Sequence, residues 1–117
     1  MSEYSIYHNP RCSKSRQTLE LLKENGVEPK VVEYLKTPPS VAELTRVLKL
    51  LGMKPQELMR KKEAEYKSSG LDDTSLSVAE QIKRMVANPK VIERPVVFSK
   101  TAAAVGRPPE NVLSVIK

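Results

Sequence analysis

The sequence predicts an α/β domain with a mixed sheet of four strands, whose two halves are separated by an all-helical insertion. Short apolar runs rich in β-branched residues occur near both ends of the chain, whereas the middle shows only helical periodicity. No repeat, linker or low-complexity segment interrupts the 117 residues. This length suits one compact domain with its own core.

The first half of the predicted sheet is a βαβ unit. Residues 3–7 are expected to form the first strand, and a helix with leucines at helical spacing follows from Ser13. Asn25 and Gly26 are a usual helix stop, and the apolar run 31–35 is the second strand. Because a helical crossover joins neighbouring strands that run in the same direction, these two strands are predicted to be parallel.

The predicted insertion, residues 37–89, begins with an amphipathic helix. Ser40 is expected to cap this helix, and Glu43 stands three residues further on, which is the spacing of a capping box. Gly52 is expected to end it. Five apolar residues at helical spacing form its predicted buried stripe: Val41, Leu44, Val47, Leu48 and Leu51.

The rest of the insertion predicts shorter and less regular elements. Pro55 begins a short helix that runs to Arg60, and the charged stretch 61–69 is predicted to be a surface loop or a frayed helix. A second amphipathic helix follows Ser77 and ends near Asn88. The side chains of this helix that are expected to face inward are Val78, Ile82, Met85 and Val86.

A hairpin and a last helix complete the predicted fold. Val96–Phe98 is the most strand-like run of the chain, and a turn at residues 99–101 leads into a second strand at 102–105. The last helix is expected to start after residues 106–109 and to run to Ile116.

This order of βαβ, helices and ββα matches the thioredoxin-like plan. It assigns residues 1–36 and 90–117 to the core and residues 37–89 to the insertion, all within a single domain 1–117. With no tryptophan and one phenylalanine, the core must be filled by leucine, valine, isoleucine and methionine.

Composition argues against several classes of function. The 20 Lys and Arg residues against 14 Asp and Glu give a net charge of +6, which suits a small anionic substrate and a solvated basic surface. The few aromatic residues argue against a nucleic-acid binder. No apolar run has the length of a membrane span, and no secretory signal is expected. One cysteine cannot make an internal disulfide, which suits a cytoplasmic protein, and one cysteine with one histidine cannot build a closed zinc site. We expect a monomer without a bound cofactor.

The chemistry of the chain centres on its one cysteine. Cys12 stands where the first strand passes through an Asn-Pro turn into the first turn of a helix. The N–H groups of that turn have no intrahelical partner, so they stabilise a thiolate and attract an anion. His8 lies four residues upstream, and three basic residues surround the cysteine: Arg11, Lys14 and Arg16. A lone cysteine is most often a small buried apolar residue, but these polar neighbours favour a reactive thiolate.

Four separated motifs run through the chain. The first is the strand followed by His8-Asn9-Pro10-x-Cys12-x-x-Ser15-Arg16, and the second is Arg60 after a short helix. The others are Arg94-Pro95-Val96-Val97 before the hairpin and Arg107-Pro108 before the last helix. In order and spacing, over essentially the whole chain, they resemble the glutaredoxin-coupled arsenate reductases.

The resemblance implies a role for each motif. Cys12 would be the nucleophile that attacks arsenate, with its ionisation tuned by His8 and Ser15. A triad of arginines would hold the oxyanion and the arsenic adduct: Arg60, Arg94 and Arg107. Guanidinium suits this task because its planar fork pairs with two oxygens and stays charged.

The resemblance also implies the partners and one backbone feature. Glutathione, as co-substrate, would attack the ester between Cys12 and arsenate, and glutaredoxin would then resolve the mixed adduct and release arsenite. The peptide bond between Arg94 and Pro95 is implied to be cis, which is otherwise seen in only about one in twenty such bonds.

Two alternatives remain open from the sequence. Residues 13 and 14 are Ser and Lys where these reductases often have Gly and Thr. The chain is then either a redox or transcriptional regulator of the same fold without arsenate turnover, or a related thiol-dependent oxidoreductase that acts on another oxyanion or a glutathione conjugate. Related regulators sense oxidants through Cys-x-x-Cys, whereas position 15 is serine here. Taken singly, each arginine is most often a solvated surface group.

Overall fold

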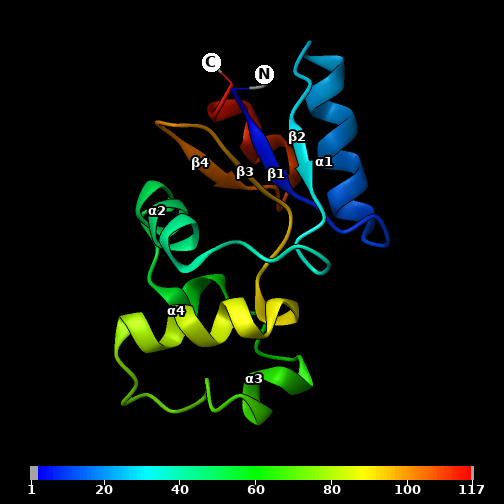
Figure 1. Cartoon of the computed structure of the whole chain (residues 1–117). Coiled ribbons are helices and arrows are strands. Elements are labelled where there is room, and N and C mark those ends of the chain that lie inside the picture. Colours follow the sequence, from blue (N-terminus) through cyan, green and yellow to red (C-terminus); the bar gives the residue numbers. More distant parts are fainter. Residues whose placement is uncertain (1–2, 117) are drawn as a thin grey trace. The chain divides into compact units, whose positions relative to one another are not determined.

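The computed structural model describes residues 3–116, and the chain divides into two compact units (Figure 1). The first, which we call the sheet unit, comprises Met1–Thr37 and Arg94–Lys117. The second, the helical unit, is Pro38–Glu93. The sheet unit therefore combines the two ends of the sequence, and the helical unit is formed by its middle.

The sheet unit is built on four strands in the order β2-β1-β3-β4. β1 (Ser5–Tyr7) pairs with β2 (Lys30–Val32) in parallel and with β3 (Val96–Phe98) in antiparallel orientation. β4 (Ala103–Val105) is antiparallel to β3. Ile6 of β1 lies between Val31 and Val97 in this register. The predicted α/β class, the mixed sheet of four strands and the thioredoxin-like order are confirmed.

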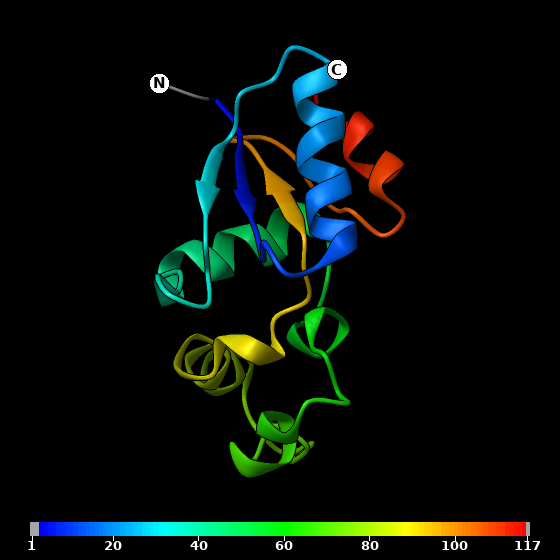
Figure 2. The ribbon, with the colours of Figure 1, turned by 90° about the vertical axis from the view of Figure 1, so that its right-hand side faces the viewer.

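Two helices of the sheet unit lie on the same side of its sheet (Figure 2). They are α1 (Ser13–Glu24) and the 3₁₀ helix η3 (Pro109–Ser114). A core cluster joins these two helices to the central strands through five buried residues: Ile6, Leu22, Val97, Val112 and Val115. The last helix was predicted to be an ordinary one that reaches Ile116, and this was wrong in type and length. The helix begins at Pro109, which has no N–H donor to give to the helix. The bond from Val115 N to Val112 O spans three residues, which is the spacing of a 3₁₀ helix and not of an α-helix.

The second strand is shorter than predicted. β2 ends at Val32, because the N–H groups of Lys36 and Thr37 both bond to the carbonyl of Glu33, at 2.9 Å each, and turn the chain. Tyr34 is nevertheless buried, and its ring lies 6.3 Å from that of Tyr7. The apolar residues 34–35 that suggested a longer strand therefore belong to a turn that leaves the sheet.

The helical unit begins with α2 (Val41–Leu51), which has the predicted caps. Ser40 Oγ accepts a hydrogen bond of 3.1 Å from Glu43 N, and Gly52 ends the helix in the left-handed conformation. The predicted inward positions 44, 47 and 48 are buried. Val41 is 42% exposed, contrary to prediction, because it is the first residue of the helix and lies at its open end.

The other helical elements of this unit are short, except α4 (Val78–Ala87). Ser77 caps α4, and its Oγ accepts from Glu80 N at 3.1 Å. Ile82 and Met85 are buried as predicted, whereas Val78, the first residue, is 57% exposed. The expected short helix at Pro55 is the 3₁₀ turn η1 (Pro55–Leu58), and stretch 61–69 contains the unburied helix α3 (Ala64–Ser68). A last 3₁₀ turn, η2, covers Pro89–Val91.

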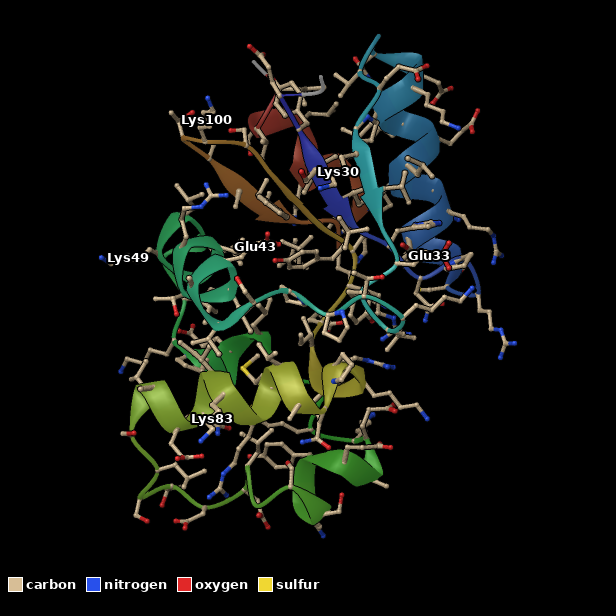
Figure 3. All side chains as sticks on the ribbon, in the orientation of Figure 1. Lys30, Glu33, Glu43, Lys49, Lys83 and Lys100 are labelled. Carbon is tan, nitrogen blue, oxygen red and sulfur yellow. The ribbon has the colours of Figure 1, made fainter. Side chains whose placement is uncertain are left out.

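The excess positive charge is distributed over the surface of both units. Lys30 and Lys100 are exposed on the sheet unit, and Lys49 and Lys83 are exposed on the helical unit (Figure 3). Over residues 3–116, none of the helices combines the length and apolar character needed to cross a membrane.

Candidate active site

Cys12 is the N-cap residue of α1. Its backbone is extended, with φ −94° and ψ 122°, and its N–H donates to the carbonyl of Asn9 at 2.9 Å. Its own carbonyl accepts from Arg16 N at 3.0 Å and so begins the helix. The residue is 8% exposed, so the thiol lies just below the surface. An N-cap side chain faces the N–H groups of the first helical turn, which is the position that the sequence predicted for the thiol.

The surroundings of Cys12 favour the thiolate. Burial of the thiol by itself would raise its pKa. The backbone N–H of Ser15, the charge of Arg94, the backbone N–H of Lys14 and the charge of Arg107 together outweigh burial and lower the pKa below its ordinary value. Because the thiolate is the nucleophilic form of cysteine, these groups favour a reactive sulfur.

Arg107 is the basic side chain in hydrogen-bond contact with the sulfur. Its Nη2 donates to Cys12 Sγ at 3.5 Å, and its Nε donates to the carbonyl of Arg94 at 2.8 Å. The Arg94–Pro95 bond is cis, which confirms the expectation, and the Arg107–Pro108 bond is cis as well. Nε and Nη1 of Arg94 are shielded from solvent. The two Arg-Pro motifs thus meet beside the first turn of α1.

Gly106 holds the second of these motifs against the helix. A Cβ atom at this position would lie 2.5 Å from Thr18 Oγ1 and 2.8 Å from Pro95 Cγ, closer than real Cβ contacts. Gly106 N donates to Pro95 O at 2.9 Å, and the buried Thr18 Oγ1 donates to Lys14 O at 2.8 Å. Sequence reasoning missed both residues. The available signal was a glycine directly before the Arg-Pro motif.

His8 and Ser15 form a buried pair beside the cysteine turn. His8 Nδ1 lies 2.6 Å from Ser15 Oγ, which also accepts from Asn9 N at 3.0 Å. Burial lowers the pKa of His8, opposed by the charge of Glu33 and helped by that of Arg16. Since Ser15 Oγ accepts from the Asn9 amide, its own proton is available to a neutral imidazole. The pair fixes the turn from β1 into α1 and therefore the approach to Cys12.

Arg60, the third predicted arginine, belongs to the helical unit. Its Nη1 lies 3.3 Å from Glu63 Oε2, and its Nε lies 3.9 Å from Glu93 Oε1. Its backbone N–H bonds to the carbonyl of Val91. The other five predicted residues lie in the sheet unit, where they surround the junction of β1 and α1: His8, Cys12, Ser15, Arg94 and Arg107.

The chemistry of this junction is that of a nucleophilic sulfur in a cationic setting. Unpaired N–H groups of a helix start and guanidinium groups are donors suited to the oxygens of a tetrahedral oxyanion. Within residues 3–116 no group of three or more His, Cys, Asp or Glu side chains could hold a metal ion.

Comparisons with known proteins show a family to which the whole chain is similar. The model of the ArsC family matches residues 7–115, a range that contains all six predicted site residues. An arsenate reductase of Neisseria meningitidis (serogroup A) is 44% identical over 117 residues, which are 99% of this chain and 100% of that protein. The uncharacterized protein YfgD of Escherichia coli K12 is 57% identical over 115 residues, 97% of each chain.

A solved structure shows the same similarity in three dimensions. The arsenate reductase from Vibrio cholerae has a TM-score of 0.92 at 47% sequence identity. The alignment covers 97% of this chain and 98% of that one. The likeness therefore includes both sequence segments of the sheet unit and the helical unit, which lies between them in the sequence.

Proposed function

Since this chain belongs to the ArsC family, we propose that it reduces arsenate to arsenite through a covalent adduct on Cys12, with glutathione and glutaredoxin as the sources of reducing thiols. The observation that supports this most directly is the contact of 3.5 Å between Arg107 Nη2 and Cys12 Sγ at the start of α1. It pairs a nucleophile with a cation that can also hold the incoming oxyanion.

In the first proposed step, the Cys12 thiolate attacks the arsenic atom of arsenate. A sulfur–arsenic bond forms, and one arsenic–oxygen bond breaks, with the oxygen leaving as water after protonation. Thiolate and arsenate are both negative, so the charges of Arg94 and Arg107 reduce the repulsion between them. The N–H groups of Lys14 and Ser15 also lower the pKa of Cys12, and they face the charge that develops on oxygen.

In the later steps, external thiols supply the electrons. Glutathione attacks the arsenic of the adduct and releases a second water molecule. A glutaredoxin thiol then attacks the glutathione sulfur and forms a disulfide with it. The bond between the glutathione sulfur and arsenic breaks, arsenic gains the two electrons of that bond, and an arsenic-bound oxygen takes up the thiol proton. Hydrolysis of the remaining sulfur–arsenic bond consumes one water, releases arsenite and restores Cys12. Overall, arsenic acid and two thiols give arsenous acid, one disulfide and water.

The single cysteine supports the use of outside thiols. The chain has one cysteine and thus no second sulfur with which to close an internal disulfide. If Cys12 is to be restored in every cycle, both sulfurs of the product disulfide must come from other molecules.

His8 and Ser15 assist this chemistry through the turn that they fix. The buried contact of 2.6 Å between them holds the backbone at Asn9, to which the N–H of Cys12 is bonded. In our proposal this pair sets the ionisation of the thiol rather than touching arsenate. Arg60 is retained as a third oxyanion ligand on the family resemblance, and Arg60→Ala is expected to raise the KM for arsenate.

The test is an assay of arsenite release that contains arsenate, glutathione and glutaredoxin. We expect turnover in the wild type and none in Cys12→Ser, with Ser114→Ala, an exposed position on η3, as the control. Arsenite release by Cys12→Ser at the wild-type rate would refute the assigned nucleophile. Absence of turnover with every thiol donor would refute the proposed function.

A further inference from the structure

We propose that a cleft beside the cysteine turn is the binding site for glutathione, the small peptide thiol with two carboxylates and one ammonium group. The cleft belongs to the sheet unit and has a volume of about 350 Å³. It is lined by seven residues, and we call it the His8–Lys36 cleft: His8, Asn9, Pro10, Arg11, Glu33, Leu35 and Lys36. The inference rests on the proposed function in one respect, since that function requires an external thiol next to Cys12.

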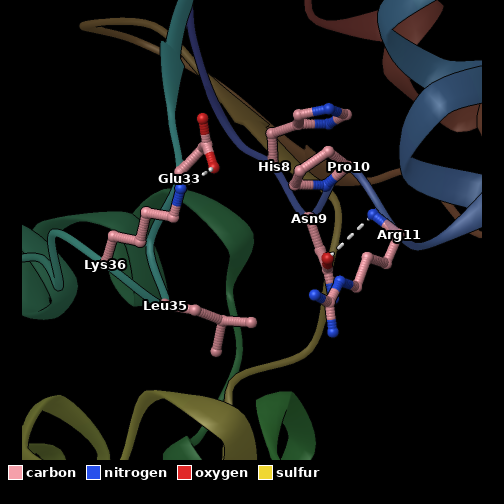
Figure 4. A pocket seen from close by; sticks show the side chains of 7 residues that line it. All are labelled: His8, Asn9, Pro10, Arg11, Glu33, Leu35 and Lys36. Atoms are coloured by element: carbon pink, nitrogen blue, oxygen red, sulfur yellow. Dashed lines mark hydrogen bonds and ion pairs between the residues drawn. The ribbon is translucent and has the colours of Figure 1, made fainter.

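The cleft lies between two segments that follow neighbouring parallel strands. Residues 8–11 follow β1, and residues 33–36 follow β2. Figure 4 shows Glu33 and Lys36 on one side and Pro10 and Arg11 on the other. The carboxyl ends of adjacent parallel strands are a common position for ligand sites in open α/β sheets. A volume of about 350 Å³ is at the small end of the range for ligand pockets, so the cleft fits a small molecule better than a segment of folded protein.

The cleft wall is next to the reactive residue. Arg11 directly precedes Cys12, and adjacent Cα atoms in a chain are about 3.8 Å apart. Asn9 contributes to the wall, and its carbonyl accepts the N–H of Cys12. A three-residue peptide spans about 10 Å when extended. A ligand of that length lying in the cleft can therefore direct its central residue, which in glutathione carries the thiol, towards Cys12.

The charges on the wall complement those of glutathione. Arg11 and Lys36 supply two positive charges, and Glu33 supplies one negative charge. Glutathione carries two carboxylates and one ammonium at neutral pH, so each charged group of the ligand has a counterpart of opposite sign. Arsenate has only negative charge, and Glu33 repels it. This difference separates the His8–Lys36 cleft from the cationic surroundings of Cys12, where Arg94 and Arg107 act.

The charged groups are available for a ligand. Glu33 and Lys36 pair at 3.5 Å, but their side chains are 43% and 80% exposed. Ion pairs this exposed contribute little to stability, so a ligand can replace the pair at small cost. Asn9 Oδ1 accepts from Arg11 N at 3.0 Å and holds the backbone from which the Arg11 side chain extends. The exposed Leu35 adds apolar surface between the charged residues, for the methylene groups of the ligand.

The experiment measures binding of S-methylglutathione, which keeps the charges of glutathione but has no free thiol. The probe is titrated into the wild-type chain, and backbone amide resonances are recorded by NMR. We expect shifts concentrated at residues 8–11 and 33–36. Lys36→Glu should raise the Kd about tenfold. The matched control is Lys100→Glu, which makes the same change in net charge at the β3–β4 turn.

The control is well separated from the cleft within the sheet unit. Phe98 pairs with Ser5 at the beginning of β1, whereas Val96 pairs with Tyr7 at its end. The turn at Lys100 and the cleft therefore lie at opposite ends of the strands. Figure 3 shows this separation of Lys100 from Glu33. Lys100→Glu should leave the Kd within twofold of the wild-type value.

The outcomes distinguish this inference from the proposed function. Shifts elsewhere in the chain, or equal Kd values for Lys36→Glu and the wild type, would overturn the glutathione site even if arsenite is released. Equal competition by inorganic phosphate would also overturn it, because the cleft would then be a site for simple anions. Specific binding without arsenate turnover would retain the site and refute the reductase.

Discussion

Gly106→Ala tests whether the loop before Arg107 sets the ionisation of Cys12. The added methyl would lie 2.5 Å from Thr18 Oγ1 and 2.8 Å from Pro95 Cγ, whereas real Cβ contacts are essentially never under 3.0 Å. Both neighbours are held in place, Thr18 on α1 and Pro95 next to β3, so the loop must move by at least several tenths of an ångström. Overpacking of this kind costs about 1–3 kcal/mol, and each kcal/mol lowers Tm by about 4 °C in a domain of this size.

The same movement weakens the contact between Arg107 and the sulfur. That contact is 3.5 Å, an ordinary distance for a sulfur acceptor, and a hydrogen bond to a charged group contributes about 1.5–3 kcal/mol. Because Arg107 is exposed, we expect the lower part of that range, which corresponds to a loss of about tenfold in kcat/KM. The assay is the pH dependence of Cys12 alkylation by iodoacetamide, whose midpoint should rise in Gly106→Ala.

Gly26→Ala is the matched control for a general loss of stability. Gly26 follows the far end of α1, has φ +77° and has no atoms within 4 Å of an added Cβ, so alanine there is strained without a clash. We expect a lower Tm and an unchanged alkylation midpoint. In the double variant Thr18→Ala/Gly106→Ala, relief of the closest contact should partly restore the midpoint. A Gly106→Ala protein with reduced Tm and the wild-type midpoint would refute the reasoning.

Three further predictions concern the same junction. Arg94→Ala should reduce kcat/KM for arsenate by about a hundredfold, on the order of 3 kcal/mol, as for other deleted oxyanion donors, and an unchanged value would exclude Arg94 from the site. Ser15→Ala removes the hydroxyl that donates to His8 Nδ1 and accepts from the Asn9 amide, and it should lower the free energy of unfolding, measured in urea, by about 1–3 kcal/mol. An unchanged free energy of unfolding would contradict the contact of 2.6 Å. Because the folded pKa of Cys12 is depressed, its ionisation stabilises the fold fully above the unfolded pKa and not at all below the folded pKa. The unfolding free energy of the wild type relative to Cys12→Ser should therefore increase with pH between these two pKa values, and a constant difference would contradict a depressed pKa.

Local sequence signals predicted the elements that carry the nucleophile. A strand, an Asn-Pro turn and a leucine-patterned helix placed Cys12 at a helix start, and the structure has it as the N-cap of α1. The caps at Ser40 and Ser77 were recognisable for the same reason, because each side chain bonds to a backbone N–H only three residues away. Exposure of Val41 and Val78 was missed, since helical spacing alone does not show that a residue lies at the open end of a helix.

Contacts between distant parts of the sequence were harder to predict. The resemblance implied the cis bond at Arg94–Pro95, but the packing of Gly106 against Thr18 joins residues 88 positions apart and has no local signature. Periodicity also failed to distinguish the 3₁₀ helix η3 from an α-helix. The role of Arg60 stays a prediction, supported by the resemblance and not by composition or spacing.

The two bonds made by the Arg107 side chain have a consequence for which residues position 107 can accept. One nitrogen, Nε, bonds to the backbone carbonyl of Arg94, while another, Nη2, faces the sulfur. A lysine has a single nitrogen at the end of a flexible stem, so it would keep the positive charge but lose the bracing that aims it. A lysine at position 107 would therefore keep the positive charge without keeping its position, and its ammonium group would not be held beside the sulfur.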